Sequence, residues 1–488
     1  MATITAPPLD SARDDRSFFG HPKGLGLLFA TEMWERFSFY GMRGLLVLYL
    51  VNALKWSDGD AARLYGNYMS LVYLTPLIGG YLADRYIGTR NALVIGGLII
   101  ATGHFVLAFS GMLAFYTGLG LVIIGTGFFK PNVSTMVGQL YAPGDPRRDT
   151  GFTIFYMGIN TGAFLAPFVC STLGERVGWH YGFAAAGVGM ALGVIGYVAL
   201  RDKYLPGIGI APANAGAAAA ADADSPSKPW HGLAGGAAGL AIAAAVTSGN
   251  WVALLMGVVI GAALGTAVLG TTGDERKRVV ALFIVVFFVV IFWAAFEQAG
   301  SSMNLFADRH TDRLIGSFLM PTGWFQSVNS MFLLIFAAVF AGLWQRLAAK
   351  GKEPPTALKM VIGLFLVGLG FVALVIGGSL VDGGAKVSPI FLLLAYLFHT
   401  WGELCVSPVG LSYVTKVAPV RFASLLMGVW FLANSAAGLV GGAMAAMTET
   451  VRSQAAFFSI PMATAMGASL LLLLLVPLLK SLTASVKA

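Results

Sequence analysis

The sequence predicts an all-α membrane protein that crosses the lipid bilayer many times. Hydrophobic residues make up 57% of its 488 residues and charged residues only 11%, whereas a soluble globular chain carries about a quarter charged residues. The mean hydropathy is +0.77. This amount of apolar surface excludes a disordered chain, and the 62 glycines lack the three-residue period of collagen.

Long apolar stretches follow one another along nearly the whole chain. A helix needs about 20 mainly apolar residues to cross the hydrocarbon core, and fourteen stretches reach this length. Those that exceed it are expected to tilt or to project from the bilayer. The predicted spans are 24–53, 63–86, 91–109, 113–140, 151–174, 178–200, 230–248, 250–271, 279–306, 320–346, 357–378, 388–416, 420–447 and 455–480.

The distribution of Lys and Arg predicts that both chain ends lie in the cytoplasm. If the N-terminus is cytoplasmic, the cytoplasmic segments carry 21 Lys and Arg and the outer segments 7. Cytoplasmic loops of membrane proteins collect these residues, so the net charge of +8 reflects topology rather than nucleic-acid binding. Residues 1–23 lack the apolar region of a signal peptide. They are expected to form a cytoplasmic tail, as are residues 481–488.

A low-complexity tract divides the chain. Residues 207–229 are rich in Ala, Gly and Pro, which is typical of a flexible linker. The two spans that follow it contain no Asp, Glu, Lys or Arg, and this indicates a peripheral pair without intramembrane function. Six spans remain on either side, as in two-halved secondary transporters. The predicted division is a six-helix bundle over 24–200, a linker with two extra helices over 201–278 and a second six-helix bundle over 279–480.

Charged side chains inside the predicted spans are the strongest functional signal, because each is costly in lipid unless it faces a cavity or a partner. The first span carries Glu32, Glu35, Arg36 and Arg43. At about 100° per residue these four and Tyr40 share one face of a helix. The plain alternative is a structural cluster of ion pairs. A buried carboxylate among cations also titrates readily, which favours a functional group.

Lys130 follows Phe128-Phe129 and precedes Pro131 in the fourth span. Proline interrupts the helical hydrogen bonds and is expected to bend the helix beside the cation. The alternative is that the lysine extends to the membrane interface. If Lys130 stays in the interior it needs a buried anion, and the intramembrane glutamates are the candidates.

The second half contributes two intramembrane acids, Glu297 and Glu403. Trp293 lies one turn before Glu297 on the same helix face. A lone glutamate within a span is expected to line a cavity. Tyr73, Asn160, Asn329 and Trp430 also lie inside spans, where such residues often only bond neighbouring helices.

The intramembrane charges differ in sign between the halves. The first half holds two acids and three bases, and the second half holds two acids. A zwitterion fits this field with its carboxylate towards the first half and its ammonium group towards the second. One bound proton would neutralise the remaining negative charge, which is a physical motive for proton coupling.

Several other functions lack their required motifs. Cys170 and Cys405 lie in apolar stretches, so the cysteines offer neither a disulfide framework nor a metal site. The sequence contains no HExxH or GxSxG motif, and its one Gly-Lys pair, Gly351-Lys352, precedes Glu353 instead of Ser or Thr. A membrane-embedded enzyme and an ATP-driven pump are therefore disfavoured. A channel or receptor stays open as an alternative, although a channel does not need two oppositely charged halves.

Six segments with distinctive motifs follow one another along the chain. They are EMWERFSFYG (Glu32–Gly41), GGYLADRYIGTR (Gly79–Arg90), GTGFFKPNVS, FYMGINTG, WFQSVNS and WGELCVSPVGLS. In this order they resemble segments of the proton-dependent oligopeptide transporter family of the major facilitator superfamily. The first is similar to the family's ExxER signature, and the second to the superfamily loop between the second and third helices. The resemblance covers all but the tails and the linker, and implies a major facilitator fold with a bacterial helix pair between the halves.

This resemblance implies a symporter that imports di- and tripeptides with protons by alternating access. It implies no cofactor and no enzyme activity, and it places the chain in the lipid of the bacterial inner membrane. The sequence carries no signal for an oligomer, so a monomer is expected by default, and the charge pattern already disfavours a nucleic-acid partner. Nitrate or another anion is the nearest alternative solute, but Glu297 would repel a bare anion. Phe39 stands where many relatives have tyrosine, and none of the six histidines falls in the second span. Proton coupling is therefore expected to rest on carboxylates.

The resemblance also implies roles for individual residues. Glu32, Glu35 and Arg36 would couple protons, and Arg36, Arg43 and Lys130 would receive the peptide carboxylate. Asn160, Glu297 and Asn329 would hold the peptide amino terminus. Arg43–Glu297 and Lys130–Glu403 would pair as gates between the halves. The remaining pocket residues would be Tyr40, Tyr73, Trp293, Glu403, Ser407 and Trp430.

Overall fold

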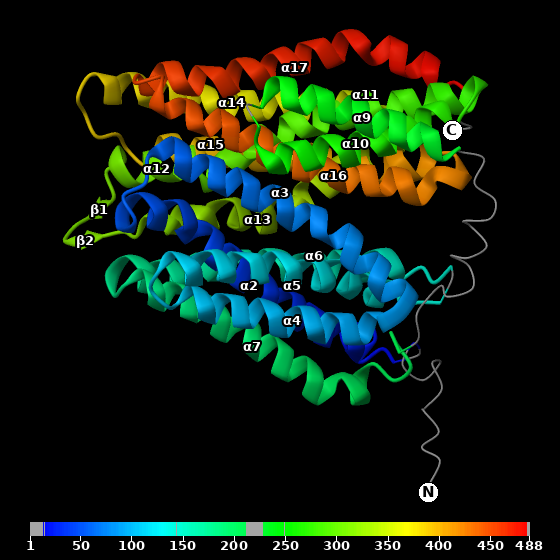
Figure 1. Ribbon diagram of the computed structural model, residues 1–488, viewed down its shortest axis with the longest axis horizontal. Coiled ribbons are helices and arrows are strands. Elements are labelled where there is room, and N and C mark those ends of the chain that lie inside the picture. Colours follow the sequence, from blue (N-terminus) through cyan, green and yellow to red (C-terminus); the bar gives the residue numbers. More distant parts are fainter. Residues whose placement is uncertain (1–12, 14, 143, 211–227, 248, 486–488) are drawn as a thin grey trace, which may run out of the picture. The chain divides into compact units, whose positions relative to one another are not determined.

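The computed structural model describes residues 13, 15–142, 144–210, 228–247 and 249–485 (Figure 1). The described chain is almost entirely helical. Each of the fourteen predicted spans overlaps a long helix, and one of them, 279–306, is divided between two helices; this confirms the predicted fold class. Most of the predicted linker, 207–229, lies outside the described residues.

The first six spans form helices close to their predicted positions. The first span continues as a π-helix, η1 (Tyr49–Ala53), and the second ends in another, η2 (Ala83–Ile87). The helices are α2 (Lys23–Leu48), α3 (Asp58–Leu82), α4 (Thr89–Leu107), α5 (Met112–Gln139), α6 (Arg148–Arg176) and α7 (Trp179–Tyr204).

The extra pair and the last six spans follow. The extra pair is α9 (Pro229–Val246) and α10 (Trp251–Leu269). The later helices are α11 (Gly273–Phe296), α12 (Ser302–Arg309), α13 (Gln326–Ala349), α14 (Thr356–Asp382), α15 (Ile390–Val417), α16 (Ala423–Ala446) and α17 (Gln454–Leu482). Short 3₁₀ segments lie at Glu297–Gly300, Thr322–Phe325, Val420–Phe422 and Met447–Glu449.

Twelve segments among the described residues are long and apolar enough to cross a membrane by length and composition. Helices α2 and α3 are not among them. The four charges in the middle of α2 and the many tyrosines and glycines of α3 lower their hydropathy. The same polar content is what makes these two helices functional candidates.

The chain packs into two compact units. The first comprises residues 1–49, 74–219 and 320–334, and the second comprises 50–73, 220–319 and 335–488, in each case as far as the chain is described. Two α-helices are therefore divided, as is the π-helix η1 at Tyr49: the first part of α3 belongs to the second unit, and the first part of α13 belongs to the first unit.

The predicted continuous span 279–306 is interrupted, which corrects the expectation of a single helix there. Helix α11 ends at Phe296, residues Glu297–Gly300 form a 3₁₀ turn, and α12 restarts at Ser302. Small residues around Gly300 make the interruption possible. The Tyr65 hydroxyl oxygen lies 2.0 Å from where a Cβ of Gly300 would be, so only glycine fits.

A short antiparallel hairpin after α12 was not expected from the sequence. Leu314–Ile315 pair with Phe318–Leu319, and Gly316 adopts a φ of +62° in the turn. Glycine is favoured in this left-handed conformation because it has no Cβ. All four strand residues are exposed.

Close glycine contacts join α9 to α10, which lie side by side in Figure 1. A Cβ at Gly235 would lie 2.1 Å from the carbonyl oxygen of Gly261, and one at Gly239 would lie 2.0 Å from that of Gly257. Small residues four apart let helix backbones approach closely in lipid, where dispersion replaces the hydrophobic effect as the main attraction.

Substitution of Gly239 with alanine should separate these two helices. The added methyl group overlaps the Gly257 carbonyl, and overpacking of this kind costs about 1–3 kcal/mol. Thermal unfolding of the purified protein should show a lower Tm for Gly239→Ala. Gly236→Ala is the matched control, because its Cβ meets atoms only at 3.5 Å and beyond. Equal Tm values for the two variants would contradict this account of the packing.

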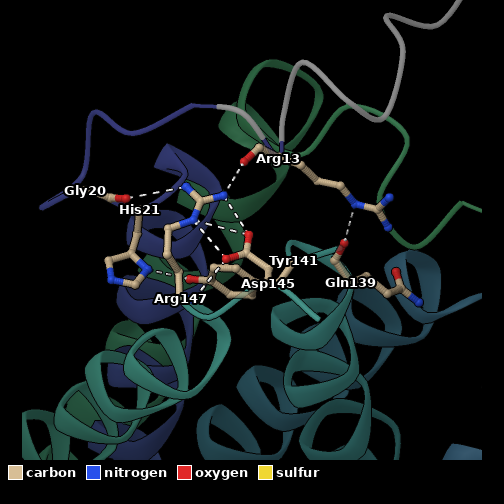
Figure 2. Close-up of polar contacts among 7 residues, drawn as sticks. All are labelled: Arg13, Gly20, His21, Gln139, Tyr141, Asp145 and Arg147. Carbon is tan, nitrogen blue, oxygen red and sulfur yellow. Dashed lines mark hydrogen bonds and ion pairs between the residues drawn. The ribbon is translucent and has the colours of Figure 1, made fainter. Parts of the chain in front are cut away.

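The segment before α2 is fastened to the loop between α5 and α6 (Figure 2). The His21 Nδ1 atom lies 2.9 Å from the Tyr141 hydroxyl oxygen. Arg147 pairs with Asp145 at 2.7 Å and donates to the carbonyl oxygen of Arg13 at 3.0 Å. Burial of the His21 ring lowers its pKa below the ordinary 6.5, and the Arg147 charge acts in the same direction.

This lowered pKa makes the attachment sensitive to acid. The folded protein prefers neutral His21, whereas the unfolded chain takes up a proton as the pH falls through 6.5. The stabilising contribution is therefore complete above that pH and is lost below it. Between pH 7.5 and pH 5.5, the Tm of the wild type should fall more than that of His21→Asn. Parallel pH profiles would show that His21 does not contribute.

Candidate functional site

The charged residues of α2 form a buried ion cluster, as their spacing predicts. The side chains of Glu32, Glu35, Arg36 and Arg43 are at most 6% exposed. The single Nε hydrogen of Arg36 is donated to Glu32 Oε1 at 2.9 Å. Glu35 Oε2 lies 2.6 Å from the same nitrogen and accepts no hydrogen bond within the described structure. One guanidinium group thus faces two carboxylates.

Helix α6 presses against α2 beside this cluster. A Cβ at Gly162 would lie 2.1 Å from the Met33 carbonyl oxygen, and one at Gly158 would lie 3.0 Å from that of Phe29. These glycines belong to the FYMGINTG segment. Four-residue spacing of small side chains permits this approach, and it holds the peptide backbone of α6 against the charged part of α2.

Lys130 lies in the same unit and acts electrostatically on Glu35. Helix α5 stays continuous through Pro131. Asn132 donates to the Phe128 carbonyl oxygen at 2.6 Å. The Gly127 carbonyl oxygen receives no helical hydrogen bond from Pro131, because proline has no N–H. A Cβ at Gly79 on α3 would lie 2.1 Å from this oxygen. Glycine at position 79 therefore allows α3 to pack against the proline-containing part of α5.

Glu297 lies at the interruption between α11 and α12 in the second unit. Its side chain is 7% exposed, and its Oε2 atom accepts a hydrogen bond from the Tyr65 hydroxyl at 2.9 Å. Interrupted helices form substrate and ion sites in many transporters, because they expose backbone groups in the membrane interior. Sequence reasoning found Glu297 but missed Tyr65, whose partner is 232 residues away.

Neighbouring polar contacts fix the interruption in place. Gln298 donates to the carbonyl oxygens of Ala294 at 3.1 Å and Gly441 at 2.9 Å. The Ser302 hydroxyl donates to Gln298 Oε1 at 2.6 Å. These bonds tie the 3₁₀ turn to α16, so the backbone on either side of Glu297 is held from two directions.

The other predicted residues of the second unit lie on α11, α15 and α16, apart from Tyr73 on α3. Glu403 is 9% exposed and Trp430 is 6% exposed. Trp293 packs edge-on against Phe292 and Phe296, with ring centroids 5.3 and 5.1 Å away. Ser407 and Tyr73 are half-buried.

Three predicted residues of the first unit lie on α2, α6 and α13. Tyr40 is half-buried beneath Arg43, whose guanidinium carbon lies 5.5 Å from the ring centroid. Asn160 is buried and donates to the Tyr156 carbonyl oxygen at 3.0 Å, one turn back on its own helix. Asn329 is half-buried on α13. The predicted pairs Arg43–Glu297 and Lys130–Glu403 join different units and stay predictions.

Glu175 is a second residue that the sequence did not single out. Its carboxylate accepts hydrogen bonds from the backbone N–H groups of Thr322 at 2.7 Å and Gly323 at 2.9 Å. These groups begin the turn that leads into α13, so the acid satisfies donors at a helix N-terminus. Two further hydrogen bonds join this segment to α6. The Trp324 indole N–H donates to the Thr172 hydroxyl oxygen at 2.9 Å, and the Ser327 hydroxyl donates to the Phe164 carbonyl oxygen at 2.8 Å.

The described residues contain no group of three or more His, Cys, Asp or Glu side chains arranged to hold a metal ion. The intramembrane charges that the sequence singled out instead divide into a mixed acid–base group in one unit and two acids, Glu297 and Glu403, in the other. This arrangement can attract groups of opposite charge and can exchange a proton.

Removal of the Tyr65 hydroxyl should weaken the fold through Glu297. A buried hydrogen bond to a charged group contributes about 1.5–3 kcal/mol, so Tyr65→Phe should lower the unfolding free energy by about that amount. A double-mutant cycle with Glu297→Gln separates this contact from general packing. The effect of Tyr65→Phe should be clearly smaller in the Glu297→Gln background; an unchanged effect would assign it to packing alone.

Comparisons with known proteins agree with this arrangement. The profile described as the POT family matches residues 90–205 and 252–464. The chain is 39% identical to the uncharacterized transporter YclF of Bacillus subtilis, over 97% of this chain and 98% of the other. It is 38% identical to the peptide transporter YePEPT of Yersinia enterocolitica, with 95% and 96% covered.

A solved structure shares the fold over nearly the whole chain. It is a mutant of the peptide transporter POT in complex with alafosfalin. The TM-score is 0.84 at 38% sequence identity, and the alignment covers 98% of this chain and 99% of that one.

Proposed function

Because the chain belongs to the POT family of multi-pass membrane transporters, we propose that it imports di- and tripeptides together with protons by alternating access. Membership places it among secondary transporters rather than enzymes. The observation that carries the proposal is the buried ion cluster of α2, in which Arg36 faces Glu32 and Glu35. One relative in sequence is named a peptide transporter, and one solved structure with the same fold is of a peptide transporter in complex with alafosfalin.

The buried charges favour a zwitterionic substrate. The first unit holds Arg36, Arg43 and Lys130 with two glutamates, and the second holds Glu297 and Glu403. The peptide carboxylate binds Arg36, Arg43 and Lys130, because these are the cations within the spans of the first unit; Arg36 and Arg43 are buried and Lys130 is half-buried. The ammonium group binds Glu297, with Asn160 and Asn329 as polar partners. The walls for the side chains come from Tyr40, Tyr73, Trp293, Glu403, Ser407 and Trp430.

Proton coupling follows from competition for one guanidinium group. In the absence of substrate, Arg36 compensates Glu32 and is close to Glu35. A peptide carboxylate that approaches Arg36 adds a third negative charge, and a proton on Glu35 or Glu32 removes one. Substrate and proton therefore favour each other's binding. A membrane potential supplies about 2.3 kcal/mol per charge per 100 mV, which drives accumulation of a neutral peptide.

The gates and topology complete the proposal. Arg43–Glu297 and Lys130–Glu403 pair and separate as the bundles 24–200 and 279–480 move, with 201–278 between them. Both chain ends lie in the cytoplasm, because this orientation places 21 Lys and Arg on that side against 7 outside. The protein acts as a monomer in the bacterial inner membrane. It uses no cofactor, and protons are its coupling ions.

Liposome uptake tests the substrate and the coupling separately. Purified protein in liposomes with an acidic exterior should accumulate dialanine, and a protonophore should abolish accumulation. Glu35→Gln should retain dialanine exchange but lose accumulation, because glutamine binds no proton in this range. Asp202→Asn, at an acid whose side chain is 79% exposed, is the control and should accumulate normally. Equilibration without accumulation in the wild type would refute coupling, and failure of dialanine to enter or compete would refute the peptide substrate.

A further inference from the structure

An apolar cavity of about 410 Å³ lies among α10, α11 and α17, all within the second unit. Nine residues line it, and all are Leu, Val, Ile or Phe. Its volume falls within the range of ligand pockets, roughly 300–1,000 Å³. Three of the lining residues are exposed at the surface: Leu264 is 41% exposed, Phe287 57% and Leu471 48%. In a membrane protein this opening faces lipid.

The cavity lies next to a basic helix end. Val268 is one residue before the end of α10, and Val280 lies two turns into α11. Arg276 is one turn before Val280 and therefore on the same face of α11, with Lys277 beside it. Both side chains are exposed. The apolar wall thus ends at two cations.

Acidic partners only partly compensate this basic end. Lys277 lies 2.8 Å from Asp274, and Arg421 pairs with Glu275. The Arg276 Nε donates to the Thr271 carbonyl oxygen at 2.7 Å. This last bond fixes the guanidinium group with a neutral partner, so its charge is not cancelled there. The net charge around this helix end is therefore positive. The four cations Arg276, Lys277, Arg278 and Arg421 lie here with the two acids Asp274 and Glu275.

We propose that this cavity is a binding site for an anionic phospholipid, with one acyl chain between α10, α11 and α17 and the phosphate at Arg276 and Lys277. The acyl chain fits the apolar walls, and the anionic headgroup fits the basic end. Basic pockets between membrane helices recognise anionic headgroups on the cytoplasmic side, which is the side that the proposed orientation gives to this loop. The site is distinct from the buried charges assigned to transport.

The extra helix pair α9 and α10 would have a structural role in this site. Helix α10 supplies one wall and packs against α11 and α16, while α9 packs against α10 through the glycine contacts. The pair therefore completes a lipid site on the outer surface of the second unit. A bilayer rich in anionic lipid would stabilise the pair against the bundle.

Native mass spectrometry of the whole protein tests this site. The protein is released from detergent after incubation with equal amounts of phosphatidylglycerol and phosphatidylcholine that carry the same chains. The wild type should retain one phosphatidylglycerol in preference to phosphatidylcholine. Each cation near the surface contributes about 1 kcal/mol, or roughly fivefold. Arg276→Gln combined with Lys277→Gln should therefore lower the preference roughly 25-fold, whereas Lys350→Gln with Lys352→Gln should leave it unchanged.

A second pair of variants tests the acyl-chain cavity. Val268→Trp fills the cavity and should reduce retention of both lipids, whereas Leu474→Trp, at a residue 69% exposed outside the cavity, should not. Leu471→Trp provides the same test at an exposed wall if Val268→Trp fails to fold. Equal retention of the two lipids by the wild type, or equal loss in Val268→Trp and Leu474→Trp, would mean non-specific surrounding lipid only and would overturn the proposal. A dimer that Val268→Trp dissociates would overturn it in favour of a second copy.

Discussion

The cost of removing charge from water governs this structure. Each intramembrane ion must meet a partner or a polar cavity, because lipid offers neither. Arg36 is the centre of the compensation, with Glu32 bonded at 2.9 Å and Glu35 beside it at 2.6 Å. The glycines of α6 allow its backbone to close over this part of α2. Close packing between these two helices is therefore achieved by small residues, which let the backbones approach each other.

The same constraint explains why Glu297 lies where a helix stops. A continuous helix satisfies its own backbone groups and offers a ligand only side chains. The 3₁₀ turn at Glu297–Gly300 leaves backbone groups for other partners. Gln298 of the turn donates to the Gly441 carbonyl oxygen of α16, and Tyr65 of α3 donates to Glu297. The interruption is thus stable although it departs from regular helix, and its acid keeps a defined position.

Residue patterns were sufficient for the fold and for the charged residues, because both are local properties. Apolar runs locate the helices, and a glutamate in such a run is conspicuous by itself. Tyr65 and Glu175 escaped notice because their importance depends on partners 232 and 147 residues away. The interruption after α11 was hidden by the strongly apolar run of α11 before it; the small residues at Gly300 and Ser301 were a local signal. The predicted gating pairs combine residues of different units, so neither local pattern nor packing within a unit addresses them.

The division of α3 and α13 between the two units has a mechanical consequence. A helix anchored in both units must bend or twist whenever they move, and the deformation concentrates where the anchorage changes, near Tyr73–Leu74 in α3 and Leu334–Ile335 in α13. Pro76 lies just beyond the first of these points, and a missing backbone hydrogen bond makes a helix more compliant there. The elastic stiffness of these two short stretches would then contribute to the barrier of every transport cycle, independently of the affinity of the site for its solute.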